Sequence, residues 1–213
     1  MEKIIAAAEA YVRAFFAGEA SGHDAHHTFR VYALARRIAR AEGADEEIAA
    51  LAALLHDVDD RKISPATSEH KDNARAFMTA QGVGQQTQED VLEIIRTMSF
   101  AGDGRSVPVS PEGKCVQDAD RLDAMGAIGI ARTFAFGGSR GRPMHDPDEA
   151  PDMHLSREAY EKRQSTSVNH FHEKLLRLRD LMNTAEGRRL AESRHAYMED
   201  FLAQFHAEWR GER

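Results

Sequence analysis

Apolar side chains recur every three or four positions along most of the chain, the spacing that gathers them on one face of an α-helix. Alternating segments of the kind that predict β-strands are nearly absent. The pattern predicts helices over residues 2–17, 24–42, 45–57, 67–81, 86–98 and 114–136, and two or three more between 156 and 209. Because no repeat, low-complexity tract or Gly/Ser linker interrupts it, we expect one all-α domain over residues 1–213.

Residues that begin and end helices stand at the expected boundaries. Gly18, Gly43 and Gly82 each follow a periodic segment, and glycine often closes a helix. Asp45 precedes "EEIAALAALL" and is suited to cap the first turn of that helix. The segments "SFAGDGRSVPVSPEG" and "GGSRGRPMHDPDEAPDM" are rich in turn-forming residues and are expected to be loops.

Composition and charge narrow the classes of function. The 213 residues are 42% hydrophobic and 30% charged, so the chain can bury a core without disulfides or a structural metal. A net charge of −7 argues against a nucleic-acid surface, which would be basic, but a bound cation would still allow a small phosphorylated substrate. Cys115 is the only cysteine, and no apolar run reaches membrane-spanning length. We therefore expect a cytoplasmic protein that binds neither nucleic acid nor membrane.

The stretch "LAALLHDVDDRK", residues 51–62, changes from apolar to ionic at His56 and Asp57. Adjacent helical positions diverge by about 100°, so both side chains can face one ion only if the ion lies beyond the end of the helix. Taken alone, the pair is also compatible with an ordinary helix end, where the helix dipole favours a histidine.

The stretch "SGHDAHHTFRV" places three histidines within five residues at a predicted helix start. His23 and His27 are four apart and can share one helical face. A zinc protease of the H-E-x-x-H type is disfavoured, because Asp24 stands where its glutamate would be. The alternative is a surface histidine cluster near a loop.

A third stretch, "VQDADRLDAMGAIGIAR", is expected to place its acidic residues at the head of an apolar, buried helix. One or two first-turn carboxylates need no special role there, because the helix dipole favours them. A carboxylate inside a buried helix, however, must pair, accept hydrogen bonds or bind a cation. Asp120 is the candidate we select. Together, His27, His56, Asp57 and Asp120 form a nitrogen and oxygen donor set suited to Mn²⁺, Fe²⁺, Zn²⁺ or Mg²⁺.

These motifs resemble those of the HD superfamily of metal-dependent phosphohydrolases. The resemblance rests on "H-x-x-R-V" from His27, "LLHD" and "DADRLDA", in that order. "GHDAHHTFRV", "LAALLHDVDDRK", "DADRLDAMGAIGIARTF", "GGSRGRP" and "HFHEKLLRLRDLMNTAEGRRLAESRH" are similar to a bacterial subgroup that includes nucleotide pyrophosphohydrolases. The resemblance runs from about Ser21 to Trp209. It implies an HD-domain helical bundle with a metal-binding core over about residues 20–135 and a helical extension over about 156–210.

Residue by residue, the resemblance implies that His27, His56, Asp57 and Asp120 are the metal ligands, while His26 is not. Relatives often carry Gly where this chain has Asp59, and an extra carboxylate there could perturb the metal charge or bind a second cation. Relatives also often carry a basic residue where this chain has Ala101, a difference that could weaken one phosphate contact.

The hypothesis that follows is hydrolysis by a metal-activated water, with Mn²⁺ as the leading ion. Asp60 is expected to orient or deprotonate the water, and Lys62 to hold a phosphate. Arg30 is a further candidate for substrate binding. Arg140 and Arg142, on a glycine-containing loop, could cover the substrate phosphates as a lid, or could simply be solvated. A solvated helix end is an equally good reading of Lys62.

The expected reaction converts (deoxy)nucleoside triphosphates to monophosphate and pyrophosphate. A phosphomonoesterase acting on nucleoside monophosphates would use the same four ligands. Two alternatives of other classes are an HD-type di-iron oxygenase, which would recruit His23, Asp59 or Asp60 as ligands, and a nucleotide-binding regulator without turnover. The sequence leaves the oligomeric state open.

Overall fold

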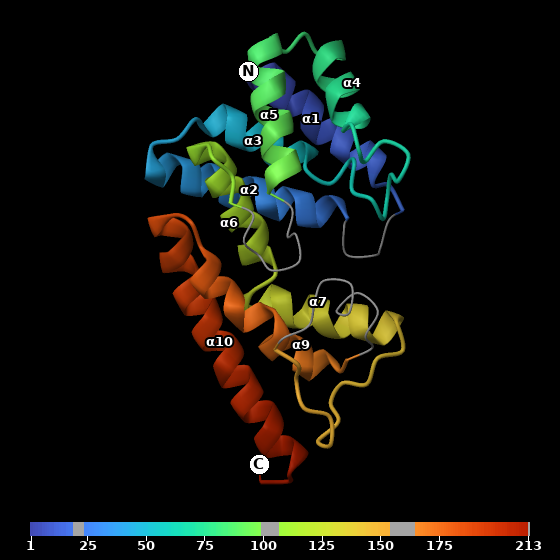
Figure 1. The fold of residues 1–213 in the computed structure, drawn as a ribbon, viewed down its shortest axis with the longest axis vertical. Coiled ribbons are helices and arrows are strands. Elements are labelled where there is room, and N and C mark those ends of the chain that lie inside the picture. Colours follow the sequence, from blue (N-terminus) through green and yellow to red (C-terminus); the bar gives the residue numbers. More distant parts are fainter. Residues whose placement is uncertain (19–23, 99–106, 154–164, 213) are drawn as a thin grey trace. The chain divides into compact units, whose positions relative to one another are not determined.

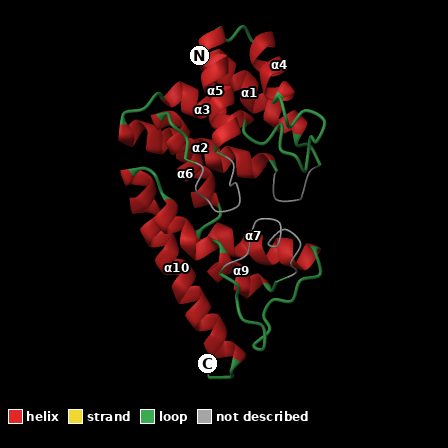
Figure 2. Ribbon diagram, in the orientation of Figure 1, coloured by secondary structure: helices red, strands yellow, loops and turns green. Residues whose placement is uncertain are grey.

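The computed structural model describes residues 1–18, 24–98, 107–153 and 165–212, and these residues form helices and connecting turns without any β-strand. Figures 1 and 2 show the helical arrangement. The chain divides into two compact units: Met1–Phe100 with Ser106–Asp120, and Ala101–Arg105 with Arg121–Arg213. The expected all-α class is confirmed, whereas a single domain over the whole chain stays a prediction.

The first unit is built around one helix whose last seven residues are all apolar and buried. This helix, α3 (Glu46–Leu55), is buried at every position from Ala49 to Leu55. A helix that is apolar on all sides can be stable only inside a core. Its neighbours are α1, α2 and α5, and α4 packs on α5. The bounds of these helices and of α6 are α1 Glu2–Phe15, α2 Ala25–Glu42, α4 Asp72–Ala80, α5 Gln85–Thr97 and α6 Pro111–Asp123.

The ends of α2 and α3 follow the sequence signals. The carboxylate of Asp45 accepts hydrogen bonds from the first-turn N–H groups of Glu47 and Ile48. Gly43 closes α2 with φ 70°, the left-handed conformation that glycine adopts without steric cost. The predicted start of α4 at residue 67 is wrong, because residues 65–71 form turns and Lys71 itself is left-handed at φ 58°.

The second unit contains α7 (Gly126–Ser139), α9 (Ser167–Glu173), the 3₁₀ helix η1 (Leu175–Leu181) and α10 (Ala185–Trp209). The long helix α10 packs against α7 and η1, and α9 also packs against α7 and η1. An aromatic cluster joins three of these helices, with ring centroids about 6 Å apart: Phe134, Phe171, Phe201 and Phe205.

The predicted long helix over residues 114–136 is in fact two helices. α6 ends at Asp123 and α7 begins at Gly126, whose φ of 69° turns the chain. Gly129 makes the joint compact, because a Cβ there would lie 2.3 Å from the carbonyl oxygen of Ala124. The acidic residues of "DADRLD" therefore lie in the last turns of α6, and the expectation that they head an apolar helix is wrong.

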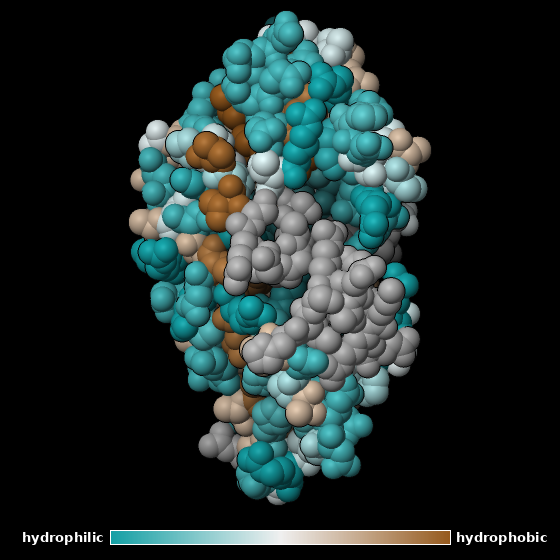
Figure 3. All heavy atoms as spheres, viewed as in Figure 1, coloured by the Kyte–Doolittle hydropathy of each residue, from teal (hydrophilic) through white to brown (hydrophobic). Residues whose placement is uncertain are grey.

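The face of the molecule seen in Figure 3 is mostly hydrophilic, with limited apolar patches. No helix within the described residues combines the length and the apolar character needed to cross a bilayer.

Candidate metal centre

His56 and Asp57 lie where the buried helix α3 ends. His56 is the residue that follows the last helical position, and its ring Nδ1 lies 2.8 Å from the carbonyl oxygen of Ala53. A carbonyl can only accept, so Nδ1 carries the proton and donates, which leaves the lone pair on Nε2. The end of α3 thus fixes both the ring and its tautomer, as is typical of a histidine that binds a metal.

His27 enters the same place from the first turn of α2. The carboxylate of Asp24 caps this helix by accepting a 2.7 Å hydrogen bond from the backbone N–H of His27. His27 is buried, whereas the neighbouring His26 is exposed. The helix start therefore directs one of the two adjacent histidines inward and the other to solvent.

Three donor atoms converge at this point. The two Nε2 atoms of His27 and His56 are 3.3 Å apart, and Oδ2 of Asp57 lies 3.4 Å from the first and 3.3 Å from the second. Ligand atoms bound about 2.1 Å from one ion are separated by about 3.0–3.4 Å in octahedral or tetrahedral geometry. The three residues form a cluster suited to a metal ion, the only such group found among the residues that the structure describes.

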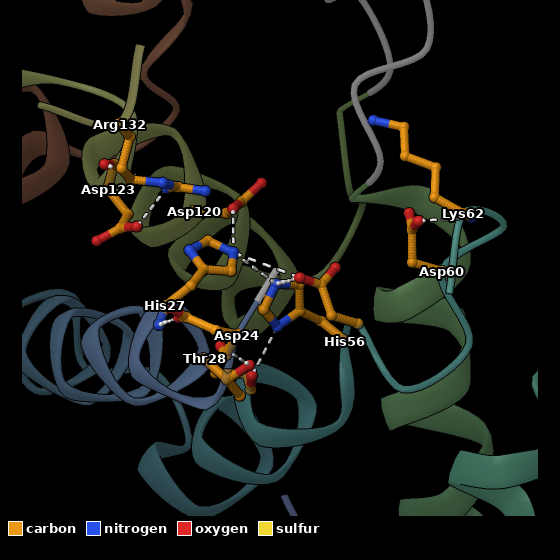
Figure 4. Close-up of polar contacts among 11 residues, drawn as sticks. Asp24, His27, Thr28, His56, Asp60, Lys62, Asp120, Asp123 and Arg132 are labelled. Carbon is orange, nitrogen blue, oxygen red and sulfur yellow. Dashed lines mark hydrogen bonds and ion pairs between the residues drawn. The ribbon is translucent and has the colours of Figure 1, made fainter. Parts of the chain in front are cut away.

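Asp120 completes the predicted set from the last turns of α6. Its Oδ1 lies 3.5 Å from Nε2 of His27, and Figure 4 shows its carboxylate next to the His27 ring. The Asp120 side chain is 37% exposed, compared with 3% for His27 and 9% for Asp57. Asp120 therefore stands at the solvent-facing edge of an otherwise buried group.

The electrostatics of the cluster favour a cation. Burial by itself lowers the pKa of His56, but the charge of Asp57 and a hydrogen bond to it, with a contribution from Asp120, outweigh burial and hold the pKa above 6.5. The carboxylates thus stabilise positive charge at the ring nitrogens. A divalent cation in that place fits both the donor atoms and the field of these residues.

Asp60 and Lys62 are not brought into this cluster (Figure 4). The carboxylate of Asp60 accepts a 2.8 Å hydrogen bond from the backbone N–H of Lys62, and Figure 4 shows both residues apart from the histidines. Lys62 is exposed. Arg30 is half-buried on α2, one turn after His27.

Arg140 and Arg142 belong to the second unit, and both guanidinium groups lie over the ring of Phe136, at 5.4 and 5.6 Å from its centroid. The expected flexible loop is wrong for its first half, because residues 137–139 form the last turn of α7. Gly137 is required there by packing: a Cβ would lie 2.2 Å from Oγ of Ser167.

Asp59 does not extend the candidate metal centre. Both of its carboxylate oxygens accept hydrogen bonds from backbone N–H groups at the start of α4. The suggested second cation site at Asp59 is therefore not supported. His23 and Ala101 lie outside the described residues. The capping roles of Asp24 and Asp59 were not predicted from the sequence. The position of Asp24, three residues before His27 at a predicted helix start, indicated its role as a helix cap.

A helical bundle that gathers two imidazoles and one carboxylate around one point, with a second, partly exposed carboxylate beside His27, has the donor set of a metal-dependent hydrolase. Comparison with known proteins defines the class further. The HD domain family model matches residues 24–125, which include all four candidate ligands. YpgQ of Bacillus subtilis is 40% identical over 196 residues, 91% of this chain and 88% of YpgQ.

Solved structures agree with this relationship. A crystal structure from Lactobacillus plantarum shares 41% identity and a TM-score of 0.86, covering 99% of both chains. An HD-superfamily hydrolase from Bacillus thuringiensis shares 41% identity and a TM-score of 0.77 over 98% of both. YpgQ in complex with ADP shares 37% identity and a TM-score of 0.75, covering 97% of this chain and 95% of YpgQ. The chain belongs to the HD family and is a metal-dependent HD-type phosphohydrolase.

Proposed function

We propose that this enzyme hydrolyses (deoxy)nucleoside triphosphates to monophosphate and pyrophosphate, with Mn²⁺ as its ion. The observation that carries the proposal is the convergence of His27, His56 and Asp57 within 3.3–3.4 Å, with the half-exposed Asp120 beside them. A nucleotide substrate is supported by the related YpgQ, whose crystal structure contains ADP.

A divalent ion bound at this site supplies an acidified water and neutralises charge on a phosphate oxygen. His27, His56 and Asp57 would hold the ion from the buried side, where hydrogen bonds to Asp24 and Ala53 fix the start of α2 and the His56 ring. Asp120, whose side chain is 37% exposed, would hold the ion from the side that faces solvent.

The remaining candidate residues contribute charge for the triphosphate. Lys62 is exposed, and its flexible ammonium binds a phosphate as a point charge; Asp60 orients the Lys62 turn through its backbone hydrogen bond. Arg30 serves the phosphates from α2. Arg140 and Arg142 do the same from the end of α7, where stacking on Phe136 limits their freedom.

Identifying the phosphorus-containing products distinguishes the proposed reaction from the alternatives. The purified chain is incubated with dATP and Mn²⁺, and the phosphorus products are separated and identified. We expect dAMP and pyrophosphate in equal amounts. Orthophosphate without pyrophosphate would contradict the proposal and indicate a phosphatase, and no turnover at stoichiometric metal loading would indicate a nucleotide-binding protein. Two irons per chain with oxygen consumption would indicate an oxygenase.

A pair of adjacent histidines provides a matched test of the ligand set. His27→Ala removes a buried ligand, and we expect loss of Mn²⁺ from the protein and a decrease in kcat/KM of at least about 10³-fold. His26→Ala makes the same chemical change at the exposed neighbouring position and should retain wild-type metal content and activity. Metal content is measured by elemental analysis after dialysis. Equal behaviour of the two variants would exclude His27 as a ligand.

A further inference from the structure

Asp59 is a fully buried carboxylate two residues after the metal ligand Asp57. Its Oδ1 accepts a 3.1 Å hydrogen bond from the backbone N–H of Asn73, and its Oδ2 accepts a 2.9 Å bond from that of Ala74. Both N–H groups belong to the first turn of α4, where backbone donors lack partners within the helix. The residue directly before α4, Lys71, makes no side-chain cap, so Asp59 caps α4 from a distant point in the sequence.

Two further hydrogen bonds connect the same two segments. The side-chain amide of Asn73 donates to the carbonyl of Val58 at 2.9 Å, and the ammonium of Lys71 donates to the carbonyl of Asp59 at 3.4 Å. The backbone that directly follows Asp57 is therefore attached to the start of α4 through both side-chain and main-chain atoms.

The other side of the ligand pair is attached to α3. Nδ1 of His56 donates to the carbonyl of Ala53, in the buried part of α3. His56 and Asp57 thus lie on a short turn with one fixed point before them and another after them. Asp57 lies in the turn that follows α3, and the backbone N–H of the next residue, Val58, donates to the carbonyl of Leu55 at 3.4 Å. A change of about 0.5 Å in the position of the Asp57 carboxylate would alter its distances to the Nε2 atoms of both His27 and His56.

We propose that Asp59 and Asn73 are positioning residues that hold His56 and Asp57 in metal-binding geometry by attaching their turn to α4. This inference rests on the proposed metal site and deepens it, but it does not depend on which phosphate compound is hydrolysed. Asp59 itself binds no ion, because both its oxygens face the N–H groups of α4.

The test measures Mn²⁺ affinity directly, from the electron paramagnetic resonance signal of free Mn²⁺ in equilibrium with the full-length protein. Asp59→Asn keeps the size of the side chain but turns an NH₂ group toward a backbone N–H. We expect its Kd for Mn²⁺ to increase about 10- to 100-fold, the range found when a group that orients a metal ligand is changed. Asn73→Ala removes the side-chain bonds to the carbonyl of Val58 and to the hydroxyl of Thr67, but leaves both bonds to Asp59 in place, and should give a smaller increase in the same direction.

The control is Asp72→Asn, the same substitution made within the first turn of α4, the turn that Asp59 caps. Asp72 is exposed and stabilises α4 through the helix dipole. If Asp59 only stabilises α4, Asp72→Asn and Asp59→Asn will both lower Tm and leave the Kd for Mn²⁺ within about twofold of wild type. That result would overturn the inference. If Asp59→Asn does not fold, Asn73→Ala decides, and an unchanged Kd in that variant overturns it as well.

Failure of this inference is distinguishable from failure of the proposed function. His56→Ala should abolish Mn²⁺ binding in the same assay; if it does not, the metal site itself is wrong and the inference falls with it. If instead Mn²⁺ binds, Asp59→Asn weakens it and dATP is not hydrolysed, the inference stands and the proposed substrate is wrong.

Discussion

The ion pair between Arg132 of α7 and Asp123 of α6 should be one of the strongest single contributions to stability in the second unit. A guanidinium nitrogen lies 2.5 Å from the carboxylate of Asp123, whose side chain is 2% exposed, while that of Arg132 is 30% exposed (Figure 4). Arg132→Leu leaves the carboxylate buried without this guanidinium. Such a loss costs about 3–5 kcal/mol, and the partial exposure of Arg132 places the expected value near about 3 kcal/mol.

For a chain of this length, a loss of about 3 kcal/mol lowers Tm by about 6–12 °C. Asp123→Asn should cost less, about 1–2 kcal/mol, because the amide oxygen still accepts from Arg132. The double variant with both Arg132→Leu and Asp123→Asn should lose less stability than the sum of the two single losses, by an interaction energy of about 1–3 kcal/mol. Urea unfolding followed by circular dichroism, with Tm from calorimetry, provides these values.

An exposed ion pair between two other helices serves as the control. Arg75 and Glu89 are 3.0 Å apart with side chains 41% and 48% exposed, so Arg75→Leu should cost only about 0–1 kcal/mol. The reasoning is refuted if Arg132→Leu lowers the free energy of unfolding no more than Arg75→Leu does. It is also refuted if the losses from Arg132→Leu and Asp123→Asn are additive in the double variant.

Three further predictions follow from single sites. Burial, with the charges of Lys174 and Arg142, lowers the pKa of His170 to about 3, so below pH 6.5 the unfolded chain binds a proton at this histidine that the folded chain does not bind. The free energy of unfolding should therefore decrease as the pH falls from 6.5 to 3. Urea unfolding at each pH should show a less steep decrease in His170→Asn. Gly129→Ala would place a Cβ too close to the carbonyl oxygen of Ala124 and should lower the free energy of unfolding by about 3 kcal/mol. Gly138→Ala, whose added Cβ would meet open space, should leave that free energy unchanged or raise it. Calorimetry of both variants tests the difference. Burial, with nearby carboxylates, raises the pKa of Cys115 to about 12, so a thiol reagent at pH 8 should label it only after unfolding; labelling as fast as that of free cysteine would contradict the buried position.

The helical class and the order of the candidate metal ligands along the chain were predictable from the sequence. Helical periodicity and the residues that close and cap helices are local properties, which is why the bounds of α2 and α3 agree with prediction to within a residue or two. The motifs around His27, His56, Asp57 and Asp120 carried the family resemblance, and the structure brings these four residues together.

Other features depend on contacts between residues far apart in the chain. The break between α6 and α7 could not be read from the apolar pattern, because it requires Gly129 to approach the Ala124 carbonyl. Asp59 appeared in the sequence as an additional ligand, yet its oxygens face N–H groups 14 and 15 residues later. From the sequence alone, an aspartate that binds a metal cannot be distinguished from an aspartate that caps a helix distant in the chain. Only the tertiary structure decides between the two, because it determines which donors the buried oxygens meet.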